Sequence, residues 1–115
     1  MTEYASFDDL IAGSLEDDAE DVTLPTGKVV RMRGLTRHEL LFNGKGADDN
    51  PLLLERRNVV SCLVQPKLTI AQVEQWQRRD RANGDFRALS EAIRRLSGLD
   101  EGADKSSVRD VRDES

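Results

Sequence analysis

Residues 69–99 have the sequence TIAQVEQWQRRDRANGDFRALSEAIRRLSGL, which contains the two clearest helical patterns of the chain. Thr69 and Gln72 have the form of a capping box, in which two side chains three residues apart satisfy each other's backbone amides. The apolar side chains that follow recur every three or four residues, as on the buried face of a helix. We therefore expect one helix running to about Ala82 and another, capped by Asp85, that ends near Gly98.

Two further helix starts lie upstream of this segment. The residues from Thr36 to Glu39 again have the form of a capping box, and Asn50 before Pro51 combines a good cap with a proline suited to the first helical turn. They predict a short helix ending near residue 43 and a longer one ending before Pro66. The predicted core consists of apolar residues at helical spacing: Val59, Val60, Leu63, Ile70, Val73, Trp76, Phe86, Leu89, Ile93 and Leu96.

A β-hairpin is expected before the helices. The β-prone segments 22–24 and 28–32 flank a Pro-Thr-Gly turn. Strand alternation places Val30 and Met32 inward and Arg33 outward. Because a hairpin is not stable alone, it must pack on the helices. The predicted fold is thus mainly α: a small bundle of about four helices with an N-terminal β-hairpin and disordered charged ends.

The chain of 115 residues has the size of a single domain. Its charge divides it into three parts. The first 21 residues contain eight acids and no base, whereas residues 22–99 contain 14 bases and eight acids. We expect an acidic flexible leader over residues 1–20, a folded domain over residues 21–99 and a disordered polar tail over residues 100–115. The opposite charges of the leader and the domain raise the hypothesis that the leader lies over the domain until a client displaces it.

Groups suited to catalysis are scarce. His38 is the only histidine and lies in a polar turn, and Cys62, the only cysteine, lies in an apolar run. One histidine and one cysteine cannot form the usual structural zinc site. No phosphate-binding or dinucleotide-binding glycine motif is present. The sequence therefore predicts a protein that is not an enzyme and uses no cofactor and no metal.

The order of three segments resembles the tail assembly chaperones of long-tailed, siphovirus-type bacteriophages. They are VTLPTGKVVRMRGLT at residues 22–36, the stretch from Val59-Val60 to VQPKLT at 64–69, and GDF at 84–86 through IRRLSGL at 93–99. The resemblance implies a protein that binds the tape measure protein and keeps it soluble while the tail tube polymerises. It also implies a frameshifted longer form that binds the tail tube protein, a location in the host cytoplasm and absence from the mature virion.

A coat for a long helical client needs an exposed apolar face that acts through many copies. The predicted client-binding face lies on the first and second helices of the domain and consists of Leu40, Leu41, Phe42, Leu52 and Leu53. Self-association is left open, and no membrane contact is expected because no apolar stretch is long enough to span a bilayer.

Two other interpretations remain open. Arginines at positions 78, 79, 81, 94 and 95 could contact phosphates in a small nucleic-acid-binding regulator. They lie on several helix faces without aromatic partners, however, so nucleic acid is the less favoured partner. The third interpretation is a structural head or tail component that stays in the virion.

Overall fold

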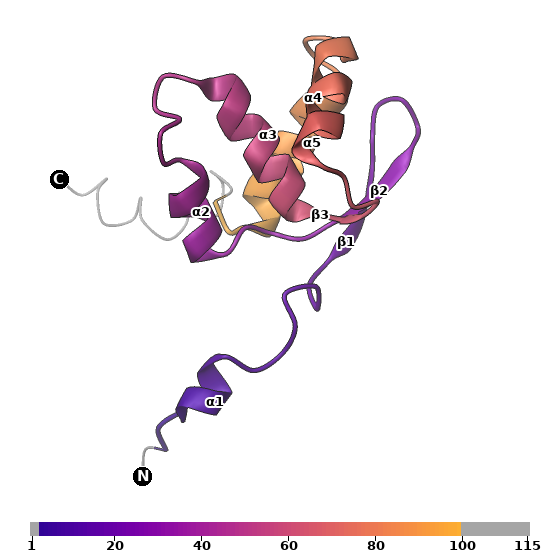
Figure 1. Ribbon diagram of the computed structural model, residues 1–115. Helices are drawn as coiled ribbons and strands as arrows, with labels where there is room; N and C mark the ends of the chain where they lie inside the picture. The colour runs from indigo at the N-terminus through magenta and orange to yellow at the C-terminus, as the bar shows by residue number, and fades with distance from the viewer. Residues whose placement is uncertain (1–2, 100–115) are drawn as a thin grey trace, which may run out of the picture.

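The computed structural model describes residues 3–99, which form helices packed against a small antiparallel sheet (Figure 1). The elements in chain order are α1 (Phe7–Leu10), β1 (Glu20–Thr23), β2 (Val29–Met32), α2 (Arg37–Asn43), α3 (Pro51–Cys62), β3 (Leu63–Gln65), α4 (Ile70–Arg79) and α5 (Asp85–Leu96). The prediction of a mainly α bundle of about four helices is therefore wrong. The described residues have a mixed fold, with a three-stranded sheet as well as helices.

The predicted hairpin is confirmed as β1 and β2, and a third strand extends it. The strand order is β1-β2-β3, with Val22 opposite Val30 and Met32 opposite Leu63. Because β3 follows α3 without a loop, the apolar run 59–64 starts in a helix and ends in a strand. A short apolar run fits either structure, so its periodicity did not reveal the change.

The tip of the hairpin is fastened to the start of α5. The backbone amide and hydroxyl of Thr26 donate to the Asp85 carboxylate at 3.4 and 3.2 Å. Asp85 is the first residue of α5, so the prediction that Asp85 caps this helix is wrong. Asp80 takes the capping role, since its carboxylate accepts from the amides of Asp85 at 3.0 Å and Phe86 at 2.7 Å.

The core lies between the sheet and helices α3, α4 and α5. Its fully buried side chains include Met32 and Cys62 as well as Val59, Leu63, Val73 and Leu89 from the predicted set. Phe86 and Ile93 are also buried, while Val60, Trp76 and Leu96 are partly buried against this cluster. The prediction that Ile70 belongs to the core is wrong. Ile70 is 44% exposed because the first residue of α4 faces away from the core.

The leader extends away from the domain (Figure 1). Helix α1 has a complete capping box between Ser6 and Asp9, and all four of its residues are exposed. The predicted tail, residues 100–115, lies outside the described residues. No helix within residues 3–99 combines the length and apolar character needed to cross a membrane.

Candidate client-binding surface

Helix α2 has the reverse of the usual division between buried and exposed side chains. Its buried residue is Asn43, while Leu41 and Phe42 are 61% and 60% exposed. A helix that is held to a domain by hydrophobic packing buries its apolar side chains instead. Other contacts must therefore hold α2 in place.

Polar contacts anchor the C-terminal end of α2 to α3. The Asn43 amide nitrogen donates to Asn58 Oδ1 and to Ser61 Oγ, each at 3.1 Å. Arg57 of α3 donates to the backbone carbonyls of Asn43 at 3.0 Å and of Lys45 at 2.8 Å. These bonds satisfy carbonyl groups that a helix end leaves without a partner.

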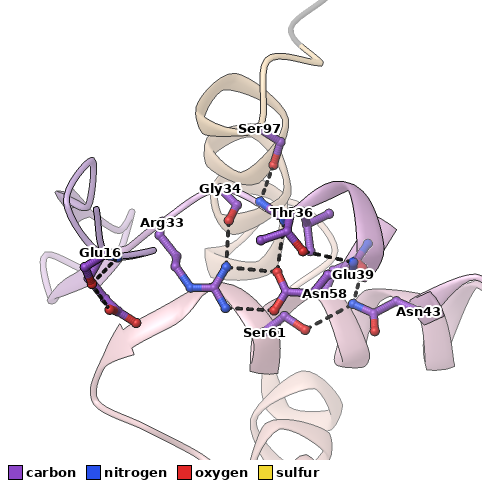
Figure 2. A network of polar contacts seen from close by, with 11 residues as sticks. Glu16, Arg33, Gly34, Thr36, Glu39, Asn43, Asn58, Ser61 and Ser97 are labelled. Atoms are coloured by element: carbon purple, nitrogen blue, oxygen red, sulfur yellow. Dashed lines mark hydrogen bonds and ion pairs between the residues drawn. The ribbon is translucent and has the colours of Figure 1, made fainter. Parts of the chain in front are cut away.

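An ion pair anchors the N-terminal end of α2 (Figure 2). The two terminal nitrogens of Arg33 donate to the two carboxylate oxygens of Glu39 at 2.9 and 2.8 Å, and Glu39 also closes a capping box with Thr36. The hydrogen bonds from Arg33 lower the pKa of Glu39, and the same bonds raise the pKa of Arg33. The pair therefore stays ionised at neutral pH.

The segment between β2 and α2 also rests on the end of α5. The Leu35 amide donates to Ser97 Oγ at 2.7 Å, and Gly34 lies so close to the Leu96 backbone that a Cβ atom there would overlap it. Glycine is the residue that permits such an approach. Both ends of α2 are thus fixed, one to α3 and the other to β2 and α5.

An apolar hollow of about 240 Å³ lies between α2, α3 and α5. The side chains that line it include Leu35, Leu40, Pro51, Leu54, Ile93 and Leu99. Among the five residues of the predicted client-binding face, Leu40 lines the hollow, Leu53 is half-buried, and Leu41, Phe42 and Leu52 point to solvent with at least 56% exposure. We call these five residues together with the hollow the α2 surface.

The remaining candidate groups do not form a reaction centre with the α2 surface. His38 stacks on Phe42 with 5.6 Å between ring centroids, so it extends the apolar surface. Cys62 is buried, and burial raises the pKa of its thiol to about 12. Two of the arginines considered for phosphate contacts pair with acids instead: Arg78 with Glu74 at 2.7 Å and Arg95 with Glu20 at 3.0 Å.

The anchoring residues were not identified from the sequence. Strand alternation predicts an outward Arg33, and β2 does alternate from Val29 to Met32, but the strand ends at Met32. Arg33 lies beyond that end, where its backbone amide donates to the Cys62 carbonyl at 2.9 Å, and its side chain is buried as Met32 is. The sequence places Asn43 only at the end of a helix. The one signal for the ion pair is the opposite charge of Arg33 and of Glu39, the second member of the capping box, and this signal is weak because charged pairs are common.

Comparisons of the chain with protein-family models, curated proteins and solved structures found no match. What the geometry provides is a helix held at both ends that exposes Leu41 and Phe42, next to an apolar hollow.

Proposed function

We propose that the protein is a tail assembly chaperone of a long-tailed bacteriophage. It acts in the host cytoplasm, binds the tape measure protein through the α2 surface, keeps that client soluble while the tail tube polymerises, and is left out of the mature virion. A frameshifted longer form would bind the tail tube protein. The observation that carries the proposal is that α2 buries Asn43 and exposes Leu41 and Phe42.

The size of the exposed apolar surface fits a binding mode that depends on repetition. Complete burial of a leucine or phenylalanine side chain contributes about 1.5–3 kcal/mol. Since Leu41 and Phe42 are about 60% exposed, covering both contributes about 2–4 kcal/mol. Association itself costs at least about 4 kcal/mol, so a single contact of this size would be weak. Many copies along one long helical client would make it effective.

The polar anchors make this surface usable. Because Asn43, Arg33 and Glu39 hold α2, Leu41 and Phe42 contribute little to the fold and are available to a partner. The hollow beside them, lined by Leu40, has room for an aliphatic or aromatic side chain, since an apolar cavity of about 150 Å³ can hold benzene. A helical client could thus lie across α2 with one side chain inserted.

Co-expression with the tape measure protein tests the proposal. The measured quantities are the fraction of the client that stays in the supernatant after centrifugation and the amount of chaperone that co-purifies with it. The variant L41S/F42S removes the exposed apolar groups of α2. The matched control is V29S/I70S, because Val29 and Ile70 are also exposed apolar residues but lie on β2 and α4. Each of these substitutions should change stability by no more than about 0.5 kcal/mol.

We expect wild type and V29S/I70S to keep the client soluble and L41S/F42S to lose at least about nine-tenths of the co-purified complex. Equal solubility with L41S/F42S, or a client that is soluble without the protein, would contradict the proposal. Stoichiometric amounts of the protein in purified virions would point to a structural component. Salt-dependent binding to arbitrary DNA would point to a nucleic-acid-binding regulator.

A further inference from the structure

The leader carries apolar side chains that are more exposed than buried. Phe7, Leu10 and Ile11 are 71%, 74% and 61% exposed, and Leu15 is 58% exposed. Residues at spacings of three and four lie on one side of a helix, so the first three form a stripe that α1 already begins. A helix this short is not stable in water alone. The segment is therefore suited to fold against an apolar partner surface.

A series of hollows begins where the leader joins the domain. A hollow of about 240 Å³ is lined by Ser14 and Leu15 of the leader together with Arg33 and Leu35. Leu35 also lines a second hollow of about 160 Å³, which shares Leu40 and Leu99 with the apolar hollow of the α2 surface. The three hollows share lining residues and follow one another from the root of the leader to the α2 surface, and we call them together the groove.

Charge favours the leader as the occupant of this groove. Residues 3–18 contain six acids and no base. Arg33, Arg37 and Arg94 line the groove, whereas Glu55 is the one acid that the domain contributes to its lining. The buried Nε of Arg33 has no hydrogen-bond partner. In Figure 2, Glu16 of the leader is seen on the Nε side of Arg33, where its carboxylate accepts from Ser14.

The reach of the leader follows from its number of residues. Eight residues separate Leu15 from Phe7, which corresponds to about 12 Å as a helix and about 27 Å when extended. Because the leader is joined to the domain, its effective concentration at the groove is of millimolar order. The leader of another copy of the chain, at micromolar concentration, would compete poorly for the groove.

From these contacts we propose that residues 3–15 fold back onto the groove of their own chain. Phe7, Leu10 and Ile11 insert along it and cover the α2 surface, and the structure shows the leader in its undocked position. The client and the leader then compete for the same apolar groups. This competition rests on the proposed function, whereas the docking itself does not.

Paramagnetic relaxation in the full-length chain tests the docking without any client. A cysteine introduced by Ala5→Cys carries a nitroxide label, and Cys62 stays unlabelled because it is buried and the pKa of its thiol is raised to about 12. We expect strong broadening of the Leu40, Leu54 and Leu99 methyl signals that does not change on dilution. Leu10→Asp should reduce the ratio of docked to undocked chains about tenfold or more, because it removes a central apolar group.

The matched control is Ala12→Asp, which adds the same charge beside the stripe and should keep the broadening. Absence of broadening in wild type, or equal loss in both variants, would overturn the proposal. A mixture of spin-labelled chains and isotope-labelled chains without a nitroxide should show no broadening. Broadening in that mixture would mean that the groove holds the leader of a second copy, and would also overturn it.

A separate measurement tests whether the leader competes with the client for the α2 surface. In the co-purification assay at low salt, Leu10→Asp should retain the client at least as well as wild type. Loss of the client with Leu10→Asp but not with Ala12→Asp would show that the leader binds the client, which contradicts competition. Failure of the docking experiment would leave the L41S/F42S result unaffected, so the two proposals can fail separately.

Discussion

The substitution Glu39→Gln tests whether the ion pair with Arg33 holds α2 to the domain. Glu39 accepts two hydrogen bonds from Arg33 and one from the Thr36 amide, and its side chain is 22% exposed. Glutamine keeps one acceptor and turns an amide group toward the guanidinium. Breaking a fully buried pair costs about 3–5 kcal/mol. Because water still reaches Glu39, we expect a loss of about 2–3 kcal/mol in the free energy of unfolding.

The effect should depend on pH in a defined direction. The hydrogen bonds from Arg33 lower the pKa of Glu39 in the folded protein below its ordinary value of 4.5. Such a carboxyl stabilises the fold above that ordinary value, and the contribution is lost as pH falls through the folded pKa. Protonated glutamate resembles glutamine in having no charge. The stability difference between wild type and Glu39→Gln should therefore be full at pH 7 and shrink below pH 4.5.

Urea unfolding followed by tryptophan fluorescence measures this difference. Trp76 is the only tryptophan and packs edge-to-face on Phe86, with 4.9 Å between the ring centroids, so its emission reports on the core. The control is Glu91→Gln, which removes an exposed helical pair with Arg87 and should cost no more than about 0.5 kcal/mol. The reasoning fails if the two variants are equally stable, or if the gap between wild type and Glu39→Gln is the same at acid and neutral pH.

Two further substitutions test contacts that position α2 and α5. Gly34→Ala should destabilise the protein by about 1–3 kcal/mol, because the new Cβ would overlap the Leu96 backbone; thermal unfolding measures the loss. Gly44→Ala is its control, since Gly44 has helical dihedrals and a Cβ there would lie 3.7 Å from its nearest neighbour, an ordinary van der Waals contact. A loss equal to that of Gly34→Ala would contradict the close contact. Asp80→Ala removes the acceptor for the first amides of α5 and should cost about 1–2 kcal/mol in urea unfolding, whereas an unchanged midpoint would show that the cap contributes nothing.

Local signals in the sequence predicted the helix starts but not the whole fold. Thr36, Asn50 and Thr69 cap helices as expected, because a cap depends only on residues within one turn. The third strand was missed because Leu63 pairs with Met32, a contact 31 residues away that no local pattern records. The inward position of Arg33 also depends on a distant residue, because Arg33 follows the end of β2 and its backbone amide donates to the Cys62 carbonyl.

The candidate surface shows the same division between local and distant information. Leu41 and Phe42 follow a helix start, so the sequence placed them on a helix, but their exposure depends on which side of α2 faces the domain. Asn43 fixes this orientation, because its side-chain amide donates hydrogen bonds to Asn58 and Ser61 on α3. If apolar packing had decided the orientation, Leu41 and Phe42 would be buried and α2 would offer nothing to a partner. Because polar bonds decide it, stability and the proposed client binding depend on different residues, and substitutions should change them separately.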